Sequence, residues 1–406
     1  AVAVLLAVSG GVRATVGGFR ISARSPVPAA VLAAVAAGAW WALARRARSV
    51  ASDLESAWSR LERHSPSAVL IVAVLSGGVA AIFATNSASG ADASGYLSQS
   101  LLWEQRRFFH IDELSSSGVI DPVLTTPLGW RPMFFPGGQV PTYPPGLPWL
   151  MAMIPGTRYP GMVIMISAAI AVWTTGVIAT RLAGGVTGMV AAIMVATSPV
   201  YLFQSVQPMS DVPVTAAWML TWMLLIPRSG GSQPGFTPAF DAGLACALAI
   251  LIRPNLAPLA AVPLFVIGLN VRRLVTFSLP IVFAAALLMF LQNMWYGSPF
   301  RSGYGAADEL FTFANVGANA SRYLSWLVTT SPALVLAPVG VALLWRGRST
   351  RALAAFAALV VAAYLVYAVF DVWSYLRFLL PAMAVAAVFT GVALAAALKR
   401  LPASWR

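Results

Sequence analysis

The sequence predicts an all-α protein, a polytopic transmembrane helical bundle. Of the 406 residues, 59% are hydrophobic and only 10% are charged, whereas a soluble domain carries roughly 25% charged residues. The mean hydropathy is +0.78. Apolar runs recur along the chain, with basic residues between them. The net charge of +13 therefore does not indicate nucleic-acid binding, because the basic residues form no single patch.

Twelve apolar segments are candidate spans, the first of them incomplete, so we expect about 11–12 spans in one transmembrane domain over residues 1–406. The opening run has no charged residues before it, which favours a processed or truncated first helix over a signal peptide. Arg253-Pro254-Asn255 interrupts one pair of runs, which can form either a helical hairpin or one broken helix. The candidate spans are 1–12, 27–44, 68–84, 160–180, 184–200, 212–226, 239–252, 256–270, 274–292, 333–345, 352–370 and 378–398.

Basic residues in short loops predict the orientation of the bundle in the plasma (inner) membrane. If the arginine-rich loops near residues 45–63, 272–273 and 346–351 are cytoplasmic, the spans from residue 27 onward alternate correctly. Two long non-spanning segments, 85–159 and 293–332, then lie on the non-cytoplasmic side. Tryptophans in the first segment suit helices lying at the membrane surface.

An acidic residue opens the first of these segments. In SGADASGYLSQSLLWEQ, Asp92 follows a span closely, and Tyr96 and Gln99 recur behind it at helical spacing. Asp92 is either the N-cap of a surface helix or a general base or metal-coordinating carboxylate.

A second carboxylate begins a later span. In QSVQPMSDVP, Asp211 follows Gln207 and lies at the mouth of an apolar run. A helix cap is one explanation, but a carboxylate near hydrocarbon is costly and is usually functional. We expect Asp211 and Asp92 to share one hydrated pocket.

Two arginines lie in or near predicted spans. Arg253, followed two residues later by Asn255, needs a partner in its apolar setting, either an outer-face carboxylate or a lipid phosphate. Arg377, which follows Tyr375 near the last span, is either a phosphate ligand or an interfacial anchor.

Aromatic residues flank the remaining turns of the outer segments. Arg301 and Tyr304 lie in NMWYGSPFRSGYG, whose mixture of glycine and aromatic residues favours substrate contact. Tyr143 belongs to VPTYPPGLPWLMA, which predicts a rigid elbow where the chain re-enters the membrane. Its ring is a further candidate ligand contact.

The order of these motifs resembles a known group of enzymes. An acidic residue after an early span is followed by YPPGLP, SPVYLFQSVQPMSDVP, RPN, YGSPF and YLRFLLP, over roughly residues 68–398. This order resembles the GT-C class of polytopic glycosyltransferases, near the dolichyl-phosphate-mannose protein mannosyltransferase and bacterial aminoarabinose transferase families. The resemblance implies inverting transfer of a sugar from a polyprenyl-phosphate donor at the non-cytoplasmic face.

The resemblance also suggests partners and a catalytic residue. The family's outer-loop acid corresponds to Asp92, which Ala93 follows here, whereas many relatives carry two adjacent acids. This departure argues against a metal site or a mechanism built on two adjacent carboxylates, so we assign no cofactor and keep a divalent cation as an alternative. The expected partners are the donor lipid, a glycan, lipid or protein acceptor, and membrane lipids, with no nucleic acid.

Two other functions fit a polytopic chain. A twelve-span secondary transporter would account for charges within the membrane, but the two halves show no convincing repeat and the long segment 85–159 has no role in it. A non-catalytic envelope lipid-binding protein would leave the gathering of acids on one side unexplained.

Overall fold

The computed structural model describes residues 12–16, 19–23, 34–35, 37–38, 41, 50–85, 88, 90–135, 137–154, 161–227, 235–305 and 310–400. The predicted spans 1–12 and 27–44 fall almost entirely outside these residues. By its contacts the chain divides into two compact units, residues 1–63 with 397–406, and residues 64–396. Every candidate site residue belongs to the second unit.

The first unit contains a feature that the sequence did not predict. Strands β1 (Val12–Val16) and β2 (Phe19–Ala23) pair antiparallel. Helix α3 (Val50–Phe83) is continuous over 34 residues and begins in the first unit, while its residues from 64 onward belong to the second; the region around residues 50–67, which was expected to be a loop, is therefore helical. Arg60 and Arg63 therefore lie on a helix, in a region that the sequence alone did not distinguish from a basic loop.

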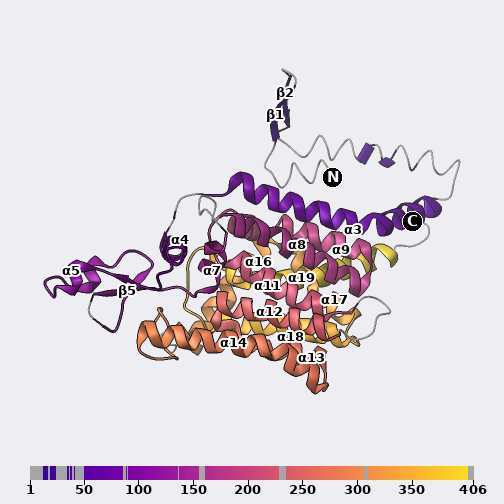
Figure 1. The fold of residues 1–406 in the computed structure, drawn as a ribbon. Helices are drawn as coiled ribbons and strands as arrows, with labels where there is room; N and C mark the ends of the chain where they lie inside the picture. The colour runs from indigo at the N-terminus through magenta and orange to yellow at the C-terminus, as the bar shows by residue number, and fades with distance from the viewer. Residues whose placement is uncertain are drawn as a thin grey trace. The chain divides into compact units, whose positions relative to one another are not determined.

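The second unit is a bundle of apolar helices, which confirms the predicted fold class. Among the described residues, five helices are long and apolar enough to cross a membrane, or up to seven if each bent pair is one span. The chain is therefore an integral membrane protein. The principal helices are α8 (Gly161–Ala183), α9 (Gly185–Ala196), α10 (Pro199–Ser205), α11 (Asp211–Leu225), α12 (Phe236–Ile252), α13 (Ala261–Ile267), α14 (Val271–Tyr296), α16 (Val316–Thr330), α17 (Ala337–Leu343), α18 (Arg348–Leu365) and α19 (Leu380–Arg400) (Figure 1).

Two of the twelve apolar runs lie almost entirely outside the described residues, and breaks in the helices contribute to the rest of the difference between the number of runs and the number of spans. Helices α9 and α10 meet at 62°, and the segments Phe313–Thr330 and Pro332–Leu343 meet at 111°. Helix α12 ends before Arg253, and the 3-10 helix η1 (Pro254–Ala260) precedes α13. The runs 212–226, 239–252 and 256–270 thus correspond to shorter apolar helices. Proline at the breaks removes backbone donors and favours such interruptions.

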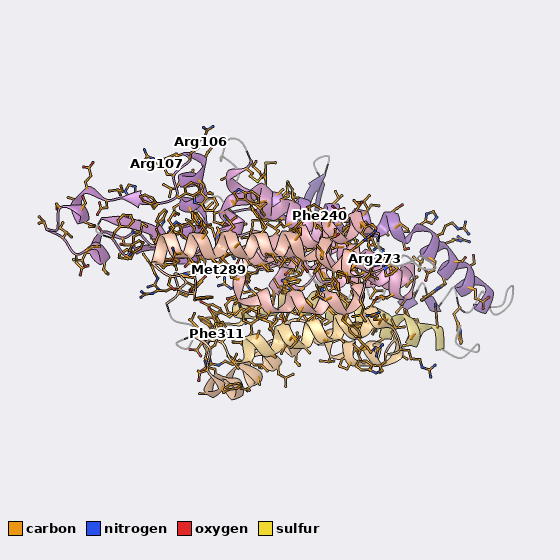
Figure 2. All side chains as sticks on the ribbon, turned by 60° about the horizontal axis from the view of Figure 1, so that its bottom comes forward. Arg106, Arg107, Phe240, Arg273, Met289 and Phe311 are labelled. Atoms are coloured by element: carbon orange, nitrogen blue, oxygen red, sulfur yellow. The ribbon has the colours of Figure 1, made fainter. Side chains whose placement is uncertain are left out.

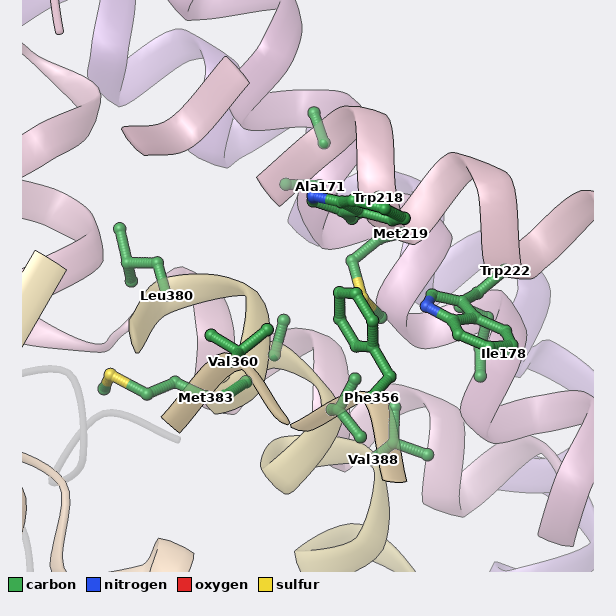
Figure 3. Close-up of a cluster of buried hydrophobic side chains, with 14 of the residues drawn as sticks. Ala171, Ile178, Trp218, Met219, Trp222, Phe356, Val360, Leu380, Met383 and Val388 are labelled. Atoms are coloured by element: carbon green, nitrogen blue, oxygen red, sulfur yellow. The ribbon is translucent and has the colours of Figure 1, made fainter. Parts of the chain in front are cut away.

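Aromatic residues fill the centre of the bundle. Phe356 of α18 lies 4.9 Å from Trp218 and 5.5 Å from Trp222 between ring centroids, and all three side chains are fully buried (Figure 3). Small residues let neighbouring helices approach. A Cβ added at Gly243 of α12 would collide with the carbonyl of Phe277 in α14, as expected for close packing in a membrane bundle.

The first outer segment carries helices, as predicted, and also a small sheet. Its helices are α4 (Gly90–Glu104), α5 (Glu113–Ser116), α6 (Pro122–Thr125) and α7 (Gly146–Ala152). Strands β3 (His110–Ile111), β4 (Trp130–Pro132) and β5 (Gly138–Pro141) form a sheet in the order β3-β5-β4. Strands of two to four residues are too short for the alternating pattern that predicts strands. In the second outer segment, α16 occupies residues that were expected to be non-spanning.

Candidate functional site

The second unit contains a cavity of ≈350 Å³ between α4, α14, the end of α12 and the chain before α19. The chain before α19 is the 3-10 helix η4 (Trp373–Leu379). Residues far apart in the sequence meet at this cavity. Eight of the predicted site residues line it: Asp92, Tyr96, Tyr143, Arg253, Asn255, Tyr304, Tyr375 and Arg377.

Two carboxylates and two guanidinium groups form a continuous chain at the cavity. Arg377 Nη2 donates to Asp92 Oδ2 at 2.8 Å, and Arg377 Nε lies 3.9 Å from Asp211 Oδ2. Asp211 Oδ1 in turn accepts from Arg253 Nη2. The structure therefore brings Asp92 and Asp211 together through Arg377. The four charges sum to zero, which makes their burial tolerable.

Asp92 is the carboxylate that reaches the cavity. It lies in the first turn of α4, where the positive end of the helix dipole favours an acidic side chain. Its side chain is 34% exposed, and the side chain of Asp211 is 1% exposed. Asp211 is not among the lining residues; it lies behind them and contacts the two arginines.

Tyr143 packs against α4 at a position without a side chain. A Cβ at Gly95 would collide with the Tyr143 ring. The ring centroid of Tyr143 lies 5.0 Å from that of Tyr96 and 5.7 Å from that of Tyr304. Burial, and next the negative charge of Asp92, raise the pKa of Tyr96 and of Tyr143 far above the usual range. These hydroxyls therefore stay protonated and can donate hydrogen bonds.

Arg253 is held by several partners at the end of α12. Its Nε donates to Ser210 Oγ at 3.3 Å and its Nη1 to Tyr364 OH at 3.1 Å. Asn255 Nδ2 also donates to Tyr364 OH, at 3.0 Å. Of the two partners that the sequence left open for Arg253, the structure shows the carboxylate.

The rigid elbow lies against the same end of α12. A Cβ at Gly146 would lie 2.5 Å from the backbone nitrogen of Ile252. The glycine of the YPPG stretch thus permits α7 to touch α12 one residue before Arg253, and this contact helps to fix the position of the guanidinium group.

Arg377 lies over aromatic rings. Its Cζ is 5.0 Å from the ring centroid of Tyr375 and 5.3 Å from that of Phe378. Such faces stabilise a guanidinium group while leaving its edge free for an anion. Arg377 is thus a cation at the cavity wall that already pairs with Asp92 and has the geometry to bind phosphate oxygens.

Besides Asp211, three predicted site residues do not line the cavity. Gln99 is fully buried on α4, and neither atom of its amide has a hydrogen-bond partner among the described residues. Gln207 turns toward α10 and donates to the carbonyl of Phe203 at 3.1 Å. Arg301 is exposed, whereas Ser302 and the two residues after it line the cavity. The tight turn that includes Gly303 directs the chain inward only after Arg301.

Several lining residues were not identified from the sequence. The cavity wall includes Tyr364, Tyr367, Phe370 and Phe378, from the end of α18 to η4. Phe370 stacks on Tyr375 with ring centroids 3.9 Å apart. These aromatics lie at the ends of apolar runs, where they look like core residues. Their density between positions 364 and 378 is the signal that could have identified them.

The carboxylates at the cavity are not grouped as metal ligands. Among the described residues, no group of three or more His, Cys, Asp and Glu side chains gathers at one place. Asp92 and Asp211 each pair with arginine. The side chains at the cavity that could ligate a metal therefore give no argument for assigning a cation to this site.

Comparison with solved structures identifies the fold. The chain superposes on ArnT from Cupriavidus metallidurans bound to undecaprenyl phosphate with a TM-score of 0.51 and 14% identity, over 86% of this chain and 61% of ArnT. It superposes on the Archaeoglobus fulgidus oligosaccharyltransferase, tethered to an acceptor peptide containing the NVT sequon, with a TM-score of 0.51 and 14% identity, over 84% of this chain and 50% of that protein. The chain thus spans about half to three fifths of the length of these neighbours.

Comparisons of sequence alone give no further relative. No protein-family model and no curated protein matches the chain. The structural comparison therefore supports the identification, together with the order of motifs along the chain. The chain has the fold of the GT-C class of polytopic membrane glycosyltransferases, the class that its motifs resemble.

Proposed function

We propose that this protein is a glycosyltransferase that moves a sugar from a polyprenyl-phosphate donor to an acceptor hydroxyl. The observation that supports it best is the pairing of Asp92 with Arg377 at one ≈350 Å³ cavity within a GT-C fold. A carboxylate that deprotonates the acceptor hydroxyl and a cation that holds the departing phosphate suffice for this reaction. The neighbour ArnT was solved with undecaprenyl phosphate, and the oligosaccharyltransferase with an acceptor peptide.

The ion pair suggests how donor binding prepares the base. A donor phosphate that takes the guanidinium edge of Arg377 releases Asp92 from its 2.8 Å contact. The freed carboxylate then accepts the proton of the acceptor hydroxyl. The acceptor oxygen attacks the anomeric carbon, the bond from that carbon to the phosphate oxygen breaks, and the polyprenyl phosphate leaves with the electron pair. Attack opposite the leaving group inverts the anomeric configuration.

Asp211 acts in this proposal through the arginines. Because it is buried and does not line the cavity, it is a positioning residue that holds Arg253 and Arg377. Those two cations stabilise the negative charge that develops on the departing phosphate. The tyrosine hydroxyls of Tyr96 and Tyr143, which remain protonated, are available to bind sugar hydroxyls.

The reaction is assigned to the non-cytoplasmic face of the plasma membrane. Asp92 lies near the start of the segment 85–159, and the basic residues expected in short loops near 272–273 and 346–351 support a cytoplasmic location for the opposite side. The transferred group is a hexose or a pentose, and the acceptor is a glycan, lipid or protein hydroxyl. No step of the proposed reaction passes through a metal ion.

A donor-turnover assay tests the proposal. The purified protein in detergent is incubated with undecaprenyl-phosphate hexoses and pentoses, and release of undecaprenyl phosphate is measured. Asp92→Asn should reduce turnover by a factor of at least about 100, the typical contribution of a general base. Asp241→Asn, which changes an exposed carboxylate on α12, is the matched control and should leave turnover unchanged.

Two results would overturn the proposal. One is donor turnover that is equal in Asp92→Asn and in the control variant. The other is solute flux into vesicles carrying the protein, with no turnover of any tested donor, which would favour a transporter.

Arg377→Gln separates binding from chemistry, because it should weaken donor binding as well as turnover, whereas Asp92→Asn should lower turnover mainly.

A further inference from the structure

A second concave surface lies outside the acidic cavity. This groove has a volume of ≈590 Å³, within the roughly 300–1,000 Å³ range of ligand sites. The end of α4, helix α7, helix α12 and helix α14 form it. Its walls carry no charge except at one end, where Arg106 and Arg107 lie.

Apolar side chains on the walls of the groove are exposed at the surface of the helical bundle. Phe283 of α14 is 71% exposed, Leu244 of α12 is 48% exposed and Met153 is 60% exposed. Side chains of this kind on a membrane-spanning surface favour a hydrocarbon chain as the occupant. A hydrocarbon chain bound there lies along α14 and α12.

The charged end of the groove follows the last turn of α4. Arg106 and Arg107 are exposed, and Figure 2 shows their side chains projecting outward there. Neither side chain has an ion pair or hydrogen bond among the described residues. Two unpaired guanidinium groups at the end of an apolar groove complement an anionic lipid head.

The backbone at this turn is strained. Arg106 has φ 59°, the single positive value for a non-glycine residue in the described part of the chain. Its amide donates to the carbonyl of Trp103 at 2.9 Å, and the amide of Arg107 donates to the carbonyl of Leu102 at 3.0 Å. Glycine is the usual residue at such a left-handed helix end. An arginine kept there at a conformational cost points to a role for its side chain.

An unused donor lies beside the two arginines. The buried indole nitrogen of Trp103, which lines the groove, has no hydrogen-bond partner among the described residues. The Trp103 ring lies 6.4 Å from that of Trp295, which lines the acidic cavity. These two rings therefore stand between the groove and the cavity.

The separation along α4 distinguishes this site from the acidic cavity. Asp92 and Glu104 are twelve residues apart on one helix, which corresponds to roughly 18 Å. Neither Arg106 nor Arg107 lines the acidic cavity, so a phosphate bound by these two arginines occupies a site other than that of the reacting donor. We infer that the groove binds an anionic phospholipid, whose phosphate contacts Arg106 and Arg107 and whose hydrocarbon chain lies between α7, α12 and α14. This inference is independent of the proposed glycosyltransferase activity.

Direct lipid binding tests the inference. The purified protein is titrated with phosphatidylglycerol and, separately, with phosphatidylcholine, and bound lipid is measured by native mass spectrometry. Phosphatidylglycerol should bind more tightly, and higher salt should weaken it. Replacing both arginines by glutamine should weaken phosphatidylglycerol binding about tenfold or more, given the energy of hydrogen bonds to charged groups. Arg272→Gln, at an exposed arginine on α14, is the matched control.

Two further variants separate binding from folding. Arg106→Gly should bind phosphatidylglycerol more weakly but unfold at the same temperature as the wild type or higher, because glycine relieves the positive φ. Ala152→Trp, which fills the groove, should weaken both lipids. Equal binding of the two lipids, or no difference between the arginine variants and Arg272→Gln, would refute the inference. Donor turnover in lipid-free detergent, measured in parallel, reports on the proposed function separately.

Discussion

Replacing Asp211 by Asn removes one charge from a buried, neutral set of four. The Asp211 side chain is 1% exposed and that of its partner Arg253 is 10% exposed. Asparagine keeps the shape but leaves Arg253 and Arg377 with a single carboxylate, that of Asp92. Breaking a buried pair by removing one partner costs about 3–5 kcal/mol. The second contact, 3.9 Å to Arg377 Nε, has a Coulomb energy of roughly 4 kcal/mol at an effective dielectric constant of 20, so the upper part of that range is expected.

Reversible unfolding in mixed micelles measures this loss. The free energy of unfolding of Asp211→Asn should fall by about 3–5 kcal/mol. Combining it with Arg253→Gln should cost less than the sum of the single changes, with a coupling energy of about 1–3 kcal/mol. Asp241→Asn serves as the control and should change the free energy by less than about 0.5 kcal/mol. The reasoning fails if Asp211→Asn behaves like this control or if the two single changes are additive.

Three further predictions concern packing and the outer segment. Phe356→Ala should lower the unfolding free energy by about 3–5 kcal/mol, because it empties the aromatic centre of the bundle; a loss below about 1 kcal/mol in the same unfolding assay would contradict the described packing. Gly95→Ala should displace the Tyr143 ring and raise the KM for donor more than Gly317→Ala, a change on α16 whose Cβ position is open and whose φ is not positive; equal kinetics would contradict this. Hydrogen bonds, first of all from Ser115, lower the pKa of Asp112. The stabilisation of α5 by Asp112 is therefore present above the usual aspartate pKa and is lost as pH falls through the lowered value. Hydrogen exchange of α5, corrected for intrinsic rates, should show protection at neutral pH that weakens in acid, and pH-independent protection would refute this.

The charged part of the site was predictable because charge in an apolar chain is rare. Asp92, Asp211, Arg253 and Arg377 each stand out against long apolar runs, and the cost of an isolated charge implies that they meet. The sequence did not indicate which pairs form. That Arg377 joins both carboxylates depends on the packing of α4, α11 and η4, which no local pattern encodes.

The aromatic part of the site was not predictable in the same way. Tyr364 binds Arg253 and Asn255 through its hydroxyl, yet a tyrosine near the end of an apolar helix equally suits a membrane interface. Gln207 and Arg301 do not line the cavity for a related reason. Ser210 and Ser302, which follow them closely in sequence, do line it, and the local turns decide which side chain faces inward.

The helical class followed directly from hydropathy, whereas the number of spans did not. Hydropathy counts apolar residues but does not register a bend, so the predicted span 184–200 ended inside α10 and did not show its angle of 62° to α9. The β3-β5-β4 sheet was missed because its strands are held by pairing between residues far apart rather than by their own pattern.

The charged chain at the cavity has a consequence for how the protein is made. Asp92 is synthesised 285 residues before its partner Arg377, and Asp211 42 residues before Arg253. Until the matching arginine has been synthesised, each carboxylate must therefore stay in contact with water, stay at the insertion machinery, or be protonated to the neutral acid. Emergence of η4 thus supplies the cation that neutralises Asp92, which ties completion of the charged cavity to a segment made long after its first carboxylate.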